Sequence, residues 1–192
     1  GDYLLKISSK DLSEKESHQL TVMLHCINDF ERIADHAINI KESAEEKFTK
    51  GLQFSEKAAM ELEIFAAAIQ EIVDITVSMF KNDDLNMASR VEPLEEIIDD
   101  LSVDMKTRHV TRLRKGACTI ELGFVLQDLT TNFERVADHC SNIALYVLQE
   151  NEEHIDAHEF MDNIKKSGDI AFERQKMYYR NRYKLPQTNV QN

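Results

Sequence analysis

The sequence predicts an all-α antiparallel helical bundle. Apolar residues recur at helical spacing along most of the chain. Two prolines and five glycines in 192 residues are too few for the turns of an all-β protein. The hydrophobic fraction of 42% is sufficient for one sizeable core. No segment approaches the roughly eighteen apolar residues of a membrane-spanning helix.

The expected helices cover residues 14–48, 56–80, 84–114, 118–150 and 156–183. Ser13, together with Glu16, is the expected N-cap of the first helix, and Ser55 is that of the second. The polar turn 81–84 separates the second and third helices, and Gly116 ends the third. Because the connections are short, neighbouring helices should run antiparallel.

Three local features stand out from this simple pattern. Pro93 falls one or two turns into the third helix, where it should kink the helix or mark its first turn. Basic and aromatic side chains gather near residues 174–184, which predicts either a solvated helix end or a surface for lipid headgroups or a partner. His154 and His158 stand at i, i+4 and could bind metal adventitiously.

Composition limits the classes of partner. A formal charge of −12 and a pI near 5.0 argue against nucleic acid and favour cations as small partners. Cys26, Cys118 and Cys140 lie in helical patterns without CxxC spacing, which predicts packed thiols in a reducing compartment. The first residues have neither a signal-peptide core nor an initiating Met, so we expect a soluble fragment of a longer protein.

One phrase of twelve residues occurs twice, at 29–40 and at 132–143, with an offset of 103 residues. From Phe30 to Ile40, eight of eleven positions are identical in the second copy. The identical positions include a glutamate, an aspartate, a histidine and an asparagine. The phrase is therefore an internal repeat that carries polar residues as well as a scaffold.

Both copies present two carboxylates at i, i+4 on one helix face: Glu31 with Asp35, and Glu134 with Asp138. These acids interrupt an apolar stripe, so they should face a helix partner rather than water. Adjacent buried carboxylates require protons, arginines or metal ions as compensation.

A further acidic pair, Glu95 and Asp99, precedes the second copy at the same spacing. The helix 84–114 can fold back at Gly116 so that this pair faces Glu134 and Asp138, which assembles four carboxylates. The equivalent pair for the first copy would fall before residue 1, which makes that site incomplete. We expect the uncovered apolar face there to be hidden by a homo-oligomer.

The segments 31–36, 134–139 and 95–99 resemble the E(D)xxxD signature of PhoU domains. PhoU proteins consist of two three-helix bundles and negatively regulate phosphate uptake at the inner face of bacterial membranes. The resemblance implies a multinuclear iron or zinc cluster. It would bind to Glu95, Asp99, Glu134 and Asp138, and to Glu31 and Asp35 in a second, incomplete site.

Three further segments, 6–13, 91–96 and 118–125, are similar to the PhoU-like cytosolic region of bacterial sodium/phosphate cotransporters. This resemblance implies a non-enzymatic regulatory domain at the cytoplasmic face of the cell membrane, with the membrane part of the transporter as its partner. Contact with phosphate stays open. The implied organisation is part of a first repeat at 1–50, a second repeat with a C-terminal helix at 51–184, and a disordered tail at 185–192.

Several alternatives remain open. The chain could be a stand-alone PhoU-type regulator, or a structural interaction module whose acids pair with arginines such as Arg32 and Arg135. A metal-dependent enzyme or metal store is disfavoured because His36 and His139 follow the glutamates at i+5, whereas the di-iron bundles use i+3. No nucleophile motif or glycine-rich phosphate loop is present in the sequence, so we do not expect an enzyme.

Overall fold

The computed structural model describes residues 2–8, 10–151 and 170–187. Its helices are α1 (Asp2–Ser8), α2 (Glu14–Thr49), α3 (Glu56–Asn82), α4 (Leu85–Arg114), α5 (Ile120–Asn151) and α7 (Ile170–Arg182). The described residues contain no strand, which confirms the predicted all-α class. None of these helices is both long enough and apolar enough to span a bilayer.

The four long helices agree with the sequence prediction to within two residues at each end. The short helix α1 was not predicted. Of the last expected helix, 156–183, only α7 is described, so His154, His158 and the first part of that helix lie outside the described residues.

Local signals explain where the helices begin and end. The Ser13 hydroxyl accepts a hydrogen bond from the backbone N–H of Glu16, and the Glu16 carboxylate accepts one from the Ser13 N–H at 2.8 Å, which completes the capping box. Gly116 has a φ of +67° just after α4, a conformation that glycine adopts without steric cost. Pro93 lies deep inside α4 rather than in its first turn.

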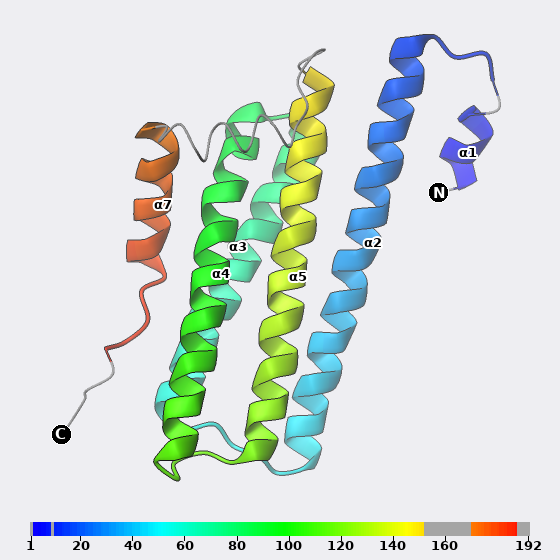
Figure 1. The fold of residues 1–192 in the computed structure, drawn as a ribbon. Helices are drawn as coiled ribbons and strands as arrows, with labels where there is room; N and C mark the ends of the chain where they lie inside the picture. The colour runs from blue at the N-terminus through cyan, green and yellow to red at the C-terminus, as the bar shows by residue number, and fades with distance from the viewer. Residues whose placement is uncertain (1, 9, 152–169, 188–192) are drawn as a thin grey trace.

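The helices form a three-helix bundle with one helix added on each side (Figure 1). Helices α3, α4 and α5 contact one another, α2 packs along α5, and α7 packs on α4. Helices α2 and α5, which carry the two copies of the repeated phrase, run antiparallel. Helices α2 and α7 therefore lie at opposite sides of the molecule.

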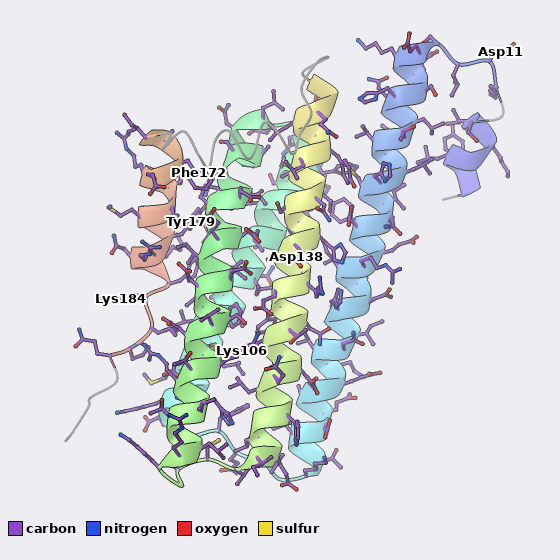
Figure 2. The ribbon with its side chains drawn as sticks, in the orientation of Figure 1. Asp11, Lys106, Asp138, Phe172, Tyr179 and Lys184 are labelled. Carbon is purple, nitrogen blue, oxygen red and sulfur yellow. The ribbon has the colours of Figure 1, made fainter. Side chains whose placement is uncertain are left out.

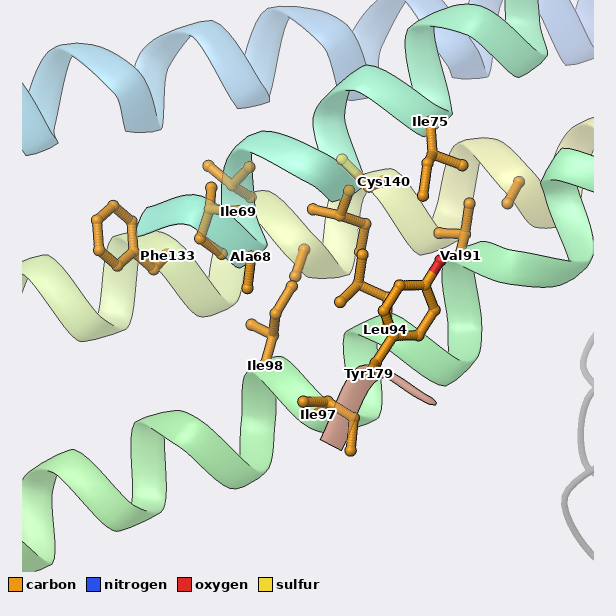
Figure 3. Packing of buried hydrophobic residues seen from close by; sticks show 14 of the residues in the cluster. Ala68, Ile69, Ile75, Val91, Leu94, Ile97, Ile98, Phe133, Cys140 and Tyr179 are labelled. Atoms are coloured by element: carbon orange, nitrogen blue, oxygen red, sulfur yellow. The ribbon is translucent and has the colours of Figure 1, made fainter. Parts of the chain in front are cut away.

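The hydrophobic core fills the space between α3, α4 and α5 and extends beneath α7 (Figure 3). Phe65 of α3 meets Phe133 of α5 edge to face, with ring centroids 5.0 Å apart. Tyr179 of α7 is fully buried near Val91 and Leu94 of α4. Its hydroxyl accepts a hydrogen bond from Arg90, which satisfies the one polar group that this ring brings into the core.

A buried ion pair joins α3 to α4. Glu61, only 2% exposed, accepts hydrogen bonds from Arg108 and Arg112, each at 2.8 Å. Arg108 also donates to the carbonyl oxygen of Pro186 at 2.6 Å, and Leu185 is buried. The predicted start of a disordered tail at residue 185 is therefore too early, because these contacts hold residues 185 and 186 against α4. Residues 188–192 lie outside the described part.

Candidate functional site

Three carboxylates converge where α4 meets α5. Glu95 and Asp99 come from α4 and Asp138 from α5 (Figure 2 labels Asp138). Each offers an oxygen, and these oxygens all lie within 4.8 Å of one another. Glu95 and Asp138 are partly buried, while Asp99 is exposed. The helix spacing of four residues and the antiparallel contact of α4 with α5 produce this convergence.

The fourth predicted carboxylate, Glu134, lies apart from this group. Lys106 of α4, which Figure 2 labels, approaches both oxygens of Glu134, with Nζ at 3.1 and 3.2 Å. The side chains of Lys106 and Glu134 are about two-thirds to three-quarters buried in this contact. A lysine therefore compensates the Glu134 charge in the structure.

The arginine that follows each glutamate forms an ion pair with the aspartate of the same motif. Arg135 donates to Asp138 at 3.3 Å, and Arg32 lies 3.8 Å from Asp35. Both pairs have the i, i+3 spacing that brings side chains together on a helix. These contacts agree with the alternative that the acids pair with Arg32 and Arg135, and the partner of each arginine is the aspartate three residues later. The Arg32–Asp35 pair is largely exposed and the Arg135–Asp138 pair is about half exposed, so both contribute little to stability.

The acids of the first copy face solvent. Glu31 and Asp35 are exposed on α2, contrary to the expectation that they would face a helix partner. The physical reason is that α2 packs on α5 through its opposite face, where Val22, Cys26 and Asp29 are buried. In the described part of the chain, no long helix covers the acidic face of α2 as α4 covers that of α5.

The two copies of the phrase exchange hydrogen bonds across the α2–α5 contact. His36 lies 2.8 Å from the Asn132 side-chain oxygen, and His139 lies 2.7 Å from Asp29. Asp29 and Asn132 are equivalent positions of the repeat, so the same bond occurs twice in opposite directions. The two imidazoles stack with centroids 5.5 Å apart. The two histidines thus join the two copies.

Sequence reasoning overlooked two kinds of residue in this region. Asp29 and Asn132 open the repeated phrase, so their polar character at equivalent positions was a usable signal. Lys106, and the pair in which Ser141 donates to Glu92, had no such signal, because only folding brings α4 against α5. Lys106 precedes its partner Glu134 by 28 residues.

The three carboxylates fit a metal ion in type and spacing. Oxygens bound to one ion at about 2.0–2.2 Å are at most about 4.4 Å apart, so three oxygens that lie within 4.8 Å of one another are close to the spacing of metal ligands. An all-oxygen set binds zinc and iron, and it also suits harder ions such as manganese and magnesium. Glu95, Asp99 and Asp138 are the residues that would hold such an ion.

Comparison with known proteins agrees with the resemblance. Residues 62–147 match the family model of the PhoU domain, which confirms the predicted domain for that segment. Over 134 residues the chain is 26% identical to the phosphate-specific transport system accessory protein PhoU homolog 1 of Thermotoga maritima. That alignment covers 70% of this chain and 57% of the relative, so the chain spans less than two thirds of that protein. No solved structure matches the chain significantly.

Proposed function

We propose that this chain is a non-enzymatic regulatory domain of phosphate transport that binds metal through Glu95, Asp99 and Asp138. The convergence of these three carboxylates from α4 and α5 is the observation that carries the proposal. All three belong to the segment that matches the PhoU domain. Bound metal would change the charge at the α4–α5 contact, and that change is the signal that we assign to the domain.

The proposed ion is iron or zinc, in a cluster of more than one metal. Carboxylates that bridge two ions hold them about 3.5–4 Å apart, and acids from two facing helices suit this arrangement. Glu134 lies one helical turn before Asp138 and is the candidate ligand for extending the site. To bind metal, Glu134 would have to give up its ion pair with Lys106. Glu31 and Asp35 would form a second, incomplete site on α2.

The wider context of the domain is also part of the proposal. The similarity of residues 6–13, 91–96 and 118–125 to transporter-linked PhoU regions supports a cytosolic domain of a sodium/phosphate cotransporter, beside its membrane part. A stand-alone PhoU-type regulator is the alternative, and the name of the Thermotoga maritima relative favours it. In both cases the domain would act at the cytoplasmic face of the membrane, and nucleic acid would not be a partner.

A second candidate is a purely structural helical module. The Lys106–Glu134 and Arg135–Asp138 pairs favour it, because they compensate two of the acids without metal. If the chain is a purely structural module, neutralising the acids would change its stability, and the metal content would be zero before and after the substitution. The two candidates therefore differ in a single measurable property, the metal content.

The deciding experiment is elemental analysis by plasma mass spectrometry on protein purified without a His-tag or chelator, after supplementation with iron, zinc and manganese. We expect stoichiometric metal in the wild type and loss of it in the Glu134→Gln/Asp138→Asn double variant. The single variants then separate the roles: Asp138→Asn should lose metal, while Glu134→Gln should lose only part of a cluster. Glu31→Gln/Asp35→Asn is the matched control: it removes the second, incomplete site on α2 and should retain the metal bound by Glu95, Asp99 and Asp138.

Wild-type protein without metal after supplementation would refute metal binding and leave the structural module. Equal loss in the double variant and the α2 control would assign the metal to a different site. Contact with phosphate can be tested by calorimetric titration of inorganic phosphate into metal-loaded and chelated protein. Heat that depends on the metal would make phosphate a ligand of the cluster.

A further inference from the structure

Lys106 lies beside the Glu134 carboxylate at a position that a metal ion would use. Its Nζ is almost equally distant from the two carboxylate oxygens, at 3.1 and 3.2 Å. A metal ion bound to the same two oxygens at about 2.0–2.2 Å would lie about 1 Å from that nitrogen. The ammonium group and a metal ion therefore cannot bind this side of Glu134 at the same time.

The order of side chains along α4 explains why a lysine reaches this carboxylate. One side of the helix carries a row of four polar residues at i, i+4, i+7 and i+11: Glu95, Asp99, Ser102 and Lys106. Asp99 and Lys106 are separated by two helical turns, about 10 Å along the axis. On the antiparallel α5, Glu134 lies one turn before Asp138 and is reached by Lys106. Glu134 therefore meets the basic end of the row, whereas Asp138 meets its acidic end.

Ser102 marks a further polar position in this row, between Asp99 and Lys106. Its side chain is fully buried, and its hydroxyl has no hydrogen-bond partner among the described residues. A buried hydroxyl without a partner is rare in folded proteins. Serine hydroxyls also bind divalent cations, as in the magnesium site of the P-loop. The row thus supplies one more oxygen of a suitable type next to the place that the ammonium group occupies.

From this geometry we propose that Lys106 is a built-in competitor for a second divalent cation, a proposal that rests on the metal binding assigned above. The first ion is the one that Glu95, Asp99 and Asp138 would hold. Without a second ion, the ammonium group binds Glu134, as it does in the structure. When a second ion binds, Glu134 exchanges the ammonium group for that ion, and Lys106 moves away with its proton. The occupancy of the site thereby sets the position of one positive charge on α4.

The competition gives the two ions different affinities. The first ion meets carboxylate oxygens that already lie within 4.8 Å of one another, whereas the second must displace a lysine side chain that is about two-thirds buried. An ammonium group a few ångströms from a divalent cation also repels it, even close to water. The second ion should therefore bind about tenfold or more weakly than it would without the lysine. The site would then respond to a higher metal concentration than the one that fills its first position.

Equilibrium dialysis of the whole chain against zinc chloride tests the competition. We expect the second zinc ion to bind Lys106→Met about tenfold or more tightly than it binds the wild type. Lys106→Arg should resemble the wild type, because it keeps the positive charge. Adding Glu134→Gln to Lys106→Met should abolish the second ion and retain the first, which would assign the second ion to Glu134. Lys57→Met, at an exposed position on α3, is the matched control and should bind zinc as the wild type does.

Acetylation of lysine amines with sulfosuccinimidyl acetate, read by peptide mass spectrometry, tests whether the lysine moves. Lys106 should react slowly without zinc and several-fold faster once the second ion is bound. Lys176 is the matched control within the same protein, because it also forms a partly buried ion pair with an acid of α4, Glu96. Its rate of acetylation should not change with zinc, and neither should that of the exposed Lys57.

Two results would overturn the role of Lys106 and leave the proposed function intact. The first is a Lys106→Met variant that binds one zinc ion but binds a second no more tightly than the wild type does. The second is a Glu134-dependent second ion with Lys106 still slow to react, which would place that ion on the other side of the carboxylate. Failure of the wild type and of every variant to bind even one zinc ion would overturn metal binding itself, and the role of Lys106 with it.

Discussion

Helices α2 and α5 carry nearly the same phrase in different surroundings. In α5, α4 covers the acidic face, and there Asp138 joins Glu95 and Asp99 while Glu134 meets Lys106. In α2 the same acids face water. The repeat therefore specifies where carboxylates stand on a helix, and the neighbouring helix decides whether they form a site. The contact between α4 and α5 therefore accounts for the difference between the two copies.

The largest expected effect comes from loosening α4 itself. Glu61→Ala removes the buried partner of Arg108 and Arg112 and leaves two guanidinium groups without their carboxylate. Removing one partner of a buried ion pair costs about 3–5 kcal/mol, so the free energy of unfolding should fall by this order. Chemical denaturation measures it. Glu63→Ala, exposed two residues away, should stay within about 0.5 kcal/mol of wild type. Equal effects in both variants would contradict a structural role for this pair.

The closeness of α4 to α5 depends on Gly123. A Cβ at this position would lie 2.7 Å from Nε2 of the buried His109 of α4, whereas the equivalent residue in α2 is Leu20. Overpacking costs about 1–3 kcal/mol, whereas replacing glycine by alanine within a helix stabilises it by about 1 kcal/mol. The net effect of Gly123→Ala should therefore be a destabilisation of about 1 kcal/mol. Its melting temperature should drop by about 2–4 °C. In a His109→Ala background the same change should be neutral or stabilising. Destabilisation that persists there would exclude the steric explanation.

A double-mutant cycle compares the covered and open acids directly. Lys106→Met with Glu134→Gln should reveal a coupling of about 0.5–1 kcal/mol, because this pair is partly buried. The cycle of Arg32→Met with Asp35→Asn on α2 should show no measurable coupling, since that pair is solvated and 3.8 Å apart. Denaturant midpoints provide both values. Similar coupling in the two cycles would mean that α4 makes no energetic difference to the repeat.

The smallest expected effect is a dependence on pH. Burial, and to a lesser extent Arg112, lowers the pKa of His109 below its ordinary value of 6.5. At a pH between the lowered pKa of the native state and the ordinary value of 6.5, His109 is protonated more in the unfolded chain than in the native one. The free energy of unfolding should therefore fall as the pH decreases through 6.5. Comparing denaturant midpoints at pH about 7.5 and about 5.5 tests this. His109→Gln should reduce the loss, and the exposed His18→Gln should not. An equal loss in all three proteins would assign the effect to other groups.

Much of the fold was predictable because its signals are local. Ser13, Ser55 and Gly116 mark helix boundaries through bonds and torsions within a few residues, and the four long helices accordingly begin and end near their predicted positions. The short helix α1 was missed because seven residues give too little periodicity to detect. The sequence also placed Pro93 one or two turns into α4, and the residue lies about two turns after Leu85, buried in the bundle.

The site was predictable only in part. The i, i+4 spacing brought Glu95 and Asp99 together with Asp138, because that geometry follows from the helix and its antiparallel neighbour. The separation of Glu134 from this group depends on Lys106, whose approach is set by the relative position of α4 and α5. The exposure of Glu31 and Asp35 depends on which face of α2 packs on α5. An amphipathic pattern with polar residues on both faces does not decide that.

The reciprocal bonds between α2 and α5 resemble a contact between two subunits. His36 with Asn132 and His139 with Asp29 form a local two-fold arrangement within a single chain. Two-fold contacts of this kind arise when identical subunits pair through the same surface. Here two copies of one phrase within a single chain form the same kind of contact, because antiparallel helices present equivalent positions to each other. The paired positions differ only in that Asp29 offers a carboxylate oxygen and Asn132 an amide oxygen.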